Sequence, residues 1–128
     1  LTLTLNNLID KNRKPFVEKS SSFLKIIDEI SSNMYGATAV IQDNTIVGVI
    51  TDGDIRRVIE KKQNIENISA SDFMNKNPKI MTENTLAIKA LKHMKENRIS
   101  QVLIIDSSNV YLGIVHVLDI IKEGVNNE

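Results

Sequence analysis

The chain of 128 residues contains one short segment twice. The sequence VGVITDGDI, which begins at Val47, returns as LGIVHVLDI. Gly48 corresponds to Gly113 and Asp54 to Asp119, and the two pairs are related by one and the same offset along the chain. A repeated supersecondary unit predicts two similar halves that pack on each other, because one copy alone cannot bury its apolar face. We expect chemistry at the seam between the copies, and the repeated aspartate is the first candidate for it.

Hydrophobic periodicity predicts the same order of elements in both copies. Ser20 to Ser22 offer hydroxyl groups for an N-cap, and Gly36 and Gly124 are the expected helix ends. The first copy reads as a helical turn at residues 6–10, a strand at 15–17, a helix at 23–34, strands at 37–42 and 46–50, and a helix at 52–62. The second copy reads as a turn at 72–75, a strand at 79–81, a helix at 85–97, strands at 102–105 and 111–115, and a helix at 117–123.

These elements predict an α/β (α+β) fold of two tandem β-α-β-β-α repeats, packed sheet to sheet with pseudo-two-fold symmetry. The first repeat, with an N-terminal lead-in, takes residues 1–64 and the second takes residues 65–128. The polar stretch 63–71 is the expected linker. Each repeat of roughly 55–60 residues is too small to be stable alone, so each should depend on the other for burial.

Composition excludes several function classes. The 16 basic and 16 acidic side chains give a formal net charge of zero without a run of like charges, which argues against nucleic acid and against an anionic membrane surface. The chain has no cysteine, which fits a reducing cytoplasm, and no apolar run long enough for a membrane span. Because it opens on Leu1 rather than methionine, we expect a fragment of a longer protein.

The first copy of the motif has a physical logic for binding an anion. A strand leads into a helix N-terminus, whose free N–H groups favour a negative charge. Thr51 can donate to a phosphate oxygen, Asp54 can accept bonds from ribose hydroxyls, and the guanidinium groups of Arg56 and Arg57 match phosphate or carboxylate. The same residues also have a purely structural reading. Thr51 and Asp54 fit a capping box, and Arg57 can pair with Asp54 along the helix.

The second copy favours the ligand interpretation. His116 replaces the threonine and is a poor N-cap, yet Asp119 persists at the same offset. A capping box would lose its purpose once the cap is gone, whereas a carboxylate that binds hydroxyls would not. His116 can donate to an anionic ligand, with pH-dependent binding, or can simply bond to the backbone. The ligand-binding candidates are Thr51, Asp52, Asp54, Arg56, Arg57, His116 and Asp119.

Metal and catalytic sites are not expected. The two histidines, His93 and His116, lie far apart in the sequence and have no clustered carboxylates beside them. No nucleophile, base and orienting group can be recognised together, and no glycine-rich phosphate loop is present. We therefore expect no cofactor and no enzymatic activity in this part of the protein.

Each copy of the β-α-β-β-α unit ends with the same motif: Gly, two apolar residues, Thr or His, and Asp three residues later. This doubled unit resembles a pair of CBS domains, also called a Bateman module. The resemblance covers residues 5–124. More narrowly, the segments GVITDGDIRR, DFMNKNP and VHVLDIIKEG resemble the C-terminal half of D-arabinose-5-phosphate isomerases. Those enzymes join a sugar isomerase (SIS) domain to a CBS pair and supply the precursor of Kdo, a sugar of lipopolysaccharide. The family typically closes with His-Leu-His-Asp, whereas this chain has Leu118 in place of the second histidine.

The resemblance implies a regulatory module that binds adenosine nucleotides or a related anion, such as CMP-Kdo, in clefts between the copies. It would place Thr51 and Asp54 at one cleft and His116 and Asp119 at the other, with Arg56 and Arg57 near phosphate or the Kdo carboxylate. It also implies a flat homodimer and a SIS domain in the same chain. Two alternatives stay open: a structural pair that only holds an oligomer together, and a CBS pair attached to a sugar nucleotidyltransferase, where similar TDGDIRR segments occur.

Overall fold

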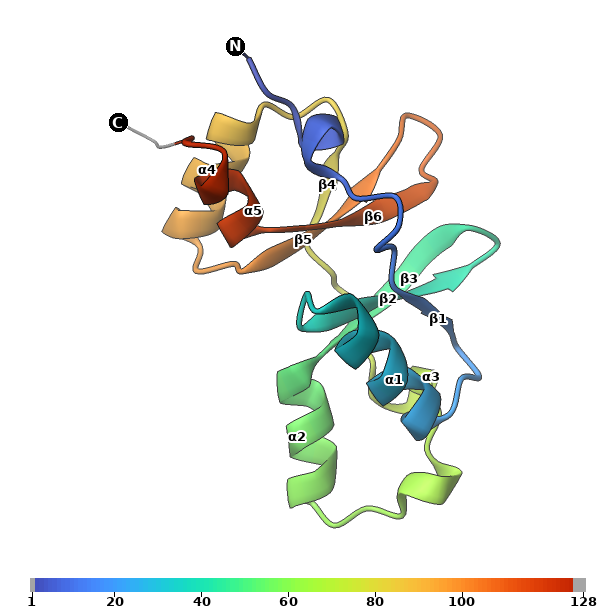
Figure 1. Ribbon diagram of the computed structural model, residues 1–128. Coiled ribbons are helices and arrows are strands. Elements are labelled where there is room, and N and C mark those ends of the chain that lie inside the picture. The colour runs from blue at the N-terminus through green and yellow to red at the C-terminus, as the bar shows by residue number, and fades with distance from the viewer. Residues whose placement is uncertain (1, 126–128) are drawn as a thin grey trace. The chain divides into compact units, whose positions relative to one another are not determined.

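The structure, a computed structural model, describes residues 2–125 and confirms the α/β fold, with the order β-α-β-β-α in each half (Figure 1). The first half contains β1 (Phe16–Glu18), α1 (Phe23–Asn33), β2 (Ala37–Gln42), β3 (Thr45–Thr51) and α2 (Asp52–Glu60). The second half contains β4 (Ile80–Thr82), α4 (Ala87–Glu96), β5 (Gln101–Ile105), β6 (Tyr111–His116) and α5 (Val117–Lys122). Three short helical turns precede or join them: η1 (Leu5–Leu8), η2 (Ile65–Asn67) and α3 (Ala70–Phe73).

Each half builds a three-stranded mixed sheet of the same design. The strand orders are β1-β2-β3 and β4-β5-β6, in which the first pair is parallel and the second is an antiparallel hairpin. A register shift interrupts both hairpins, between Val40 and Ile41 in one and between Ile104 and Ile105 in the other. The shared irregularity confirms that the two sheets repeat one pattern in detail.

Helix α1 begins where the sequence predicts and ends by a different residue. Ser22 is its N-cap, and the hydroxyl oxygen of Ser22 accepts a hydrogen bond from the Lys25 amide at 3.2 Å. The expectation that Gly36 ends this helix was wrong. Met34 already adopts the left-handed conformation at φ 61°, and its amide donates to the Ile30 carbonyl. A left-handed methionine has no local sequence signal, which is why the prediction passed it over.

The compact units of the structure are not divided where the sequence repeats are. One unit is residues 15–78, and the other combines residues 1–14 with residues 79–128. The lead-in that precedes the first repeat therefore belongs with the second repeat, and the linker belongs with the first (Figure 1). We call residues 15–78 the contiguous unit and the other the composite unit.

Equivalent backbone hydrogen bonds attach the two helical turns to their units. In the composite unit, the Leu5 amide donates to the Thr85 carbonyl at 2.9 Å. In the contiguous unit, the Ala70 amide donates to the Ser21 carbonyl at 3.0 Å. Leu5 and Ala70 are related by the same offset as the repeated glycines and aspartates, and both are fully buried. The periodicity of the sequence thus extends to the turns, even though each turn packs outside its own repeat.

The turns complete two separate hydrophobic cores. Both cores combine the inner face of a sheet, the apolar stripe of its long helix and one buried residue from a turn. The core of the contiguous unit consists of Val17, Ile26, Ile30, Val40, Ile50 and Ala70. The core of the composite unit consists of Leu5, Ala87, Ala90, Leu91, Met94, Val102, Ile104, Val115 and Ile120.

The repeated glycines leave room for the chain segments that follow these turns. A Cβ atom at Gly48 would lie 2.7 Å from the Met74 sulfur and 3.1 Å from the Asn75 carbonyl oxygen. A Cβ atom at Gly113, where φ is +152°, would lie 3.1 Å from Ile9. In both units a segment from outside the repeat crosses the strand at close range, so only glycine fits without displacement. The recurrence of glycine at these two positions therefore has a packing explanation.

We predict that Leu5→Ala lowers the free energy of unfolding by about 2–5 kcal/mol, because it opens a cavity in the core of the composite unit. Urea denaturation followed by circular dichroism measures the change. Leu24→Ala is the matched control, since Leu24 is 70% exposed, and it should change stability by less than about 0.5 kcal/mol. Equal effects of the two substitutions would contradict the placement of the lead-in.

Candidate functional site

The first strand–helix junction joins β3 to α2 through a reciprocal capping box. The Asp54 amide donates to the Thr51 hydroxyl oxygen at 3.3 Å, and the Thr51 amide donates to Asp54 Oδ2 at 2.9 Å. The Thr51 hydroxyl also lies 3.1 Å from Asp54 Oδ2. The other carboxylate oxygen, Oδ1, accepts a hydrogen bond from Arg57 Nη2 at 2.5 Å. Thr51, Asp54 and Arg57 are thus brought together, as both readings of the sequence require.

The second junction, from β6 into α5, corrects an argument made from the sequence. His116 does cap its helix: its Nδ1 accepts a hydrogen bond from the Leu118 amide at 3.1 Å. The His116 amide donates in turn to Asp119 Oδ2 at 2.8 Å. The inference that the capping function is lost in this copy was therefore wrong. Repetition of the aspartate no longer distinguishes a binding role from a capping role.

The same capping device occurs at four helix starts in the described part of the chain. Besides the two junctions, the Asn7 side-chain oxygen accepts from the Thr4 amide at 2.9 Å, and Asp72 Oδ2 accepts from the Ser69 amide at 2.8 Å. Each pair consists of a cap residue followed three residues later by Asn or Asp. The four pairs form two sets, and the members of each set are related by the offset of the sequence repeat. This spacing is a sequence signal that could have identified the caps directly.

The two junctions differ in the hydrogen-bonding capacity that remains. A carboxylate offers about four acceptor positions. Asp54 uses three of them, for two bonds from Thr51 and one from Arg57. Within residues 2–125, Asp119 uses one, and no cation pairs with it. Because Nδ1 of His116 accepts, the neutral ring carries its proton on Nε2, which leaves one N–H donor on that ring.

Two predicted site residues stand apart from these contacts. Arg56 pairs with Glu60 on the outer side of α2, with 3.4 Å between Nε and Oε1, and both side chains are mostly exposed. The Asp52 amide donates to the Gly36 carbonyl at 3.0 Å, and its side chain is exposed at the first position of α2. The structure therefore gives neither residue a place in the capping network.

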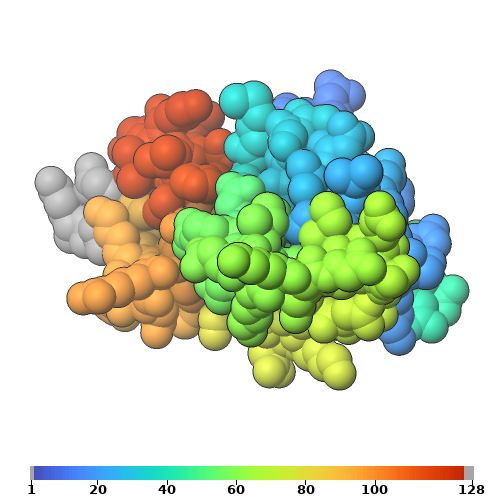
Figure 2. Space-filling model, turned by 90° about the horizontal axis from the view of Figure 1, so that it is seen from below, coloured from blue at the N-terminus to red at the C-terminus, as the bar shows by residue number. Residues whose placement is uncertain are grey.

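Asp54 and Arg57 also line a pocket of about 280 Å³ within the contiguous unit. It opens between α2 and the segment after it, which lie together in green and yellow-green in Figure 2. Sequence reasoning missed its remaining lining residues, although the capping spacing would have pointed to one of them, Asp72. They are Val58, Lys61, Gln63, Asp72 and Phe73.

The described residues contain neither a metal-binding cluster nor a membrane-spanning helix. Among residues 2–125, no group of three or more histidine or acidic side chains is placed to hold a metal ion. Over the same residues, no helix has the length and apolar character needed to cross a bilayer.

The chain matches the CBS domain family twice, over residues 9–61 and 70–126. It is a CBS domain pair. The two matches together span most of the 128 residues and follow the two sequence repeats. Solved structures agree in fold: a CBS domain protein from Pyrobaculum aerophilum complexed with AMP superimposes with a TM-score of 0.81 at 15% identity, covering 91% of this chain and 89% of that one. The protein NE2398, solved as a CBS domain, gives 0.82 at 16% identity, covering 98% and 100%.

Similar curated proteins connect this CBS pair to one group of enzymes. Arabinose 5-phosphate isomerase KdsD of Francisella tularensis is 37% identical over 123 residues, which cover 95% of this chain and 38% of the isomerase. KdsD of Escherichia coli K12 is 29% identical over 127 residues, 98% of this chain and 38% of the isomerase. The chain is homologous to the C-terminal part of these isomerases and spans about two fifths of their length.

We predict that His116→Ala lowers the free energy of unfolding by about 1 kcal/mol, because the Leu118 amide loses its acceptor. His116→Thr should preserve stability, since threonine restores the cap found at Thr51. Urea denaturation of both variants measures the difference. Similar losses in the alanine and threonine variants would show that the imidazole does not act as the cap.

Proposed function

We propose that this CBS pair is the non-catalytic regulatory region of a cytoplasmic D-arabinose-5-phosphate isomerase that acts in Kdo biosynthesis. Its homology to KdsD over almost the whole chain is the observation that carries the proposal. The catalytic SIS domain would belong to the remaining part of the same polypeptide. We further propose that the module binds a nucleotide or nucleotide-sugar anion, with CMP-Kdo as the end-product effector, and that it assembles as a homodimer.

The AMP named in the structure of the Pyrobaculum protein supports the nucleotide class of this effector. We propose two binding surfaces, one at each strand–helix junction. Residues Thr51, Asp52, Asp54, Arg56 and Arg57 would form the first, and His116 and Asp119 the second. Hydroxyl groups of a ribose or sugar can use carboxylate acceptors, whereas phosphate or carboxylate needs the guanidinium groups.

Of the two junctions, the second has more free capacity for sugar hydroxyls. Asp119 keeps most of its acceptor positions, whereas Asp54 is occupied by Thr51 and Arg57. An anionic group at the first junction would instead compete with Asp54 for Arg57, whose side chain is 59% exposed. We therefore expect sugar hydroxyls to be the main contact of a ligand at the second surface, and phosphate or carboxylate groups the main contact of a ligand at the first.

A structural pair without an effector is the second candidate, and one observation favours it. Helix capping accounts for both repeated aspartates, and the close approach of a neighbouring segment accounts for both repeated glycines. On this reading the motif serves the fold alone. Binding experiments distinguish the two candidates, because only a regulatory module binds an effector, and only its affinity can be weakened by a substitution.

We predict that Asp119→Asn weakens effector binding by about tenfold or more, measured by titration calorimetry with AMP, ATP and CMP-Kdo. Asparagine keeps an oxygen that can accept from the His116 amide, so the cap persists while the charge and one acceptor are lost. Asp106→Asn makes the same change at an aspartate that accepts backbone hydrogen bonds from Ser108 and Val110, outside the predicted site, and should leave affinity unchanged. Folded wild-type protein that gives no heat with any of the three compounds would favour the structural pair.

The proposed parent enzyme makes a second prediction. The full-length protein should interconvert D-arabinose 5-phosphate and the corresponding ketose phosphate, and CMP-Kdo should change that rate. A coupled assay of the purified full-length protein tests both parts, with Asp119→Asn as the variant that loses the response to CMP-Kdo. Activity on a nucleoside triphosphate and a sugar phosphate instead would identify a nucleotidyltransferase.

A further inference from the structure

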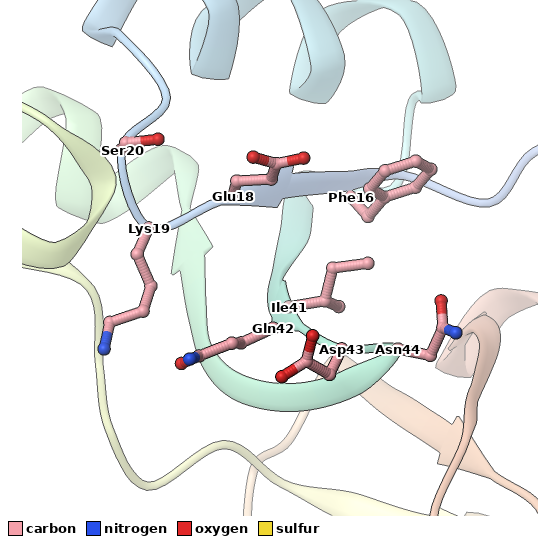
Figure 3. A pocket seen from close by; sticks show the side chains of 8 residues that line it. All are labelled: Phe16, Glu18, Lys19, Ser20, Ile41, Gln42, Asp43 and Asn44. Carbon is pink, nitrogen blue, oxygen red and sulfur yellow. The ribbon is translucent and has the colours of Figure 1, made fainter.

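A second pocket in the contiguous unit contains no residue of the repeated motif. It has a volume of about 510 Å³ and lies where β1 ends beside the β2–β3 hairpin (Figure 3). The hairpin register pairs Ala37 with Thr51 at one end of β2 and Gln42 with Thr45 at the other. The pocket is at the Gln42 end, away from the junction that carries Thr51 and Asp54.

Apolar surface forms one part of this pocket. Phe16 and Ile41 come from the ends of neighbouring strands, and Figure 3 shows them beside the bend that carries Asp43 and Asn44. Phe16 is 44% exposed, so part of its ring is accessible at the edge of the sheet. An exposed aromatic ring beside an aliphatic side chain provides a flat apolar surface for a ligand.

Planar polar side chains surround that surface. Glu18, Gln42, Asp43 and Asn44 present carboxylate and amide groups, and Lys19 and Ser20 add an ammonium group and a hydroxyl. Within residues 2–125, no side chain of these six takes part in a hydrogen bond or ion pair with another residue. The pocket thus combines free donors and free acceptors in one place, and its two carboxylates exceed its single cation.

At Glu18, the last residue of β1, the edge of the sheet is closed to an added strand. The Glu18 amide donates to the Ser21 hydroxyl oxygen at 2.9 Å, and the Glu18 carbonyl accepts from the Ser21 amide at 3.0 Å. An incoming peptide strand would need these same backbone groups. The excess of carboxylates also disfavours a phosphorylated ligand. A small, uncharged ligand rich in hydroxyl groups would use both the free donors and the free acceptors of the pocket, whereas a cation would use only the acceptors.

We propose that this pocket binds a neutral monosaccharide or similar polyol. A sugar ring has a face of C–H groups that can stack on Phe16, and hydroxyls that both donate and accept. Carboxylates of Glu18 and Asp43 accept from such hydroxyls, while the amides of Gln42 and Asn44 bond in both directions. This site is separate from the nucleotide site proposed above and does not depend on it.

The test is a titration of the isotopically labelled protein with D-arabinose and D-glucose, followed by amide NMR spectra. Saturable shifts should concentrate on residues 16–20 and 41–44. Putrescine and inorganic phosphate serve as the cationic and anionic probes and should leave these amides unshifted. Absence of saturable shifts with both sugars would overturn the proposal, as would stronger shifts with either charged probe.

Asn44→Gly is the sharpest variant, because it removes the amide without disturbing the turn. Asp43 and Asn44 have φ values of 51° and 66°, and glycine adopts such angles freely. We expect sugar affinity to fall by about tenfold. Asn109→Gly, at φ 66° in the hairpin of the composite unit, is the matched control and should retain full affinity. Unchanged sugar affinity in Asn44→Gly would overturn the assignment of the site.

A second pair of variants tests the apolar surface. Phe16→Ala should abolish the saturable shifts, whereas Ile80→Ala, at the equivalent position of β4 and 40% exposed, should not. AMP is titrated in parallel as an independent measurement. Shifts by AMP at residues 51–57 or 116–119 concern only the nucleotide proposal, so failure of either site can be recognised separately.

Discussion

The structure depends on one constraint. Each repeat is preceded by a short helical turn, and this turn is buried in the core formed mainly by the other repeat. Leu5 fills the core built by β4, β5, β6 and α4, and Ala70 fills the core built by β1, β2, β3 and α1. Both turns are attached by equivalent backbone hydrogen bonds. Neither sheet can close its core from its own repeat, so the stability of each unit requires a chain segment from elsewhere in the sequence.

This constraint explains the features that make the repeat visible in the sequence. Glycine recurs at 48 and 113 because a neighbouring segment crosses the strand too closely for a Cβ atom. Aspartate recurs at 54 and 119 because both strand–helix junctions are capped from the third helical position. The repeated glycines and aspartates are therefore explained by the requirements of folding before any binding role is considered. Any effector would use groups that the fold has already positioned, which is how a binding surface can be preorganised without strain.

The sequence predicted the elements well and their assembly less well. Apolar periodicity located every strand and long helix within a few residues, because side-chain spacing reports the local backbone directly. The left-handed Met34 was missed since a left-handed methionine leaves no local signal in the sequence. The attachment of the lead-in to the second repeat was missed because periodicity says which face of a turn is apolar but not which sheet covers it.

The sequence correctly predicted which residues meet at the first junction, but the inference that the second junction has no cap was wrong. Thr51, Asp54 and Arg57 do meet, as their helical spacing indicates. His116 was dismissed as a cap because imidazole is rare at that position, yet its unprotonated Nδ1 is a sound acceptor. The proposed sugar pocket had no sequence signal, since its residues come from two segments, 16–20 and 41–44, that lie apart in the sequence.

The interleaved arrangement of the two units has a consequence for how such a protein could arise. A solitary ancestral repeat would carry a helical turn whose apolar side has no sheet to cover, and a sheet whose core lacks a turn. Two identical subunits that exchange their leading segments would satisfy both needs at once. Gene duplication and fusion would then convert that intertwined association into a single polypeptide, with the exchanged segments retained as the lead-in and the linker.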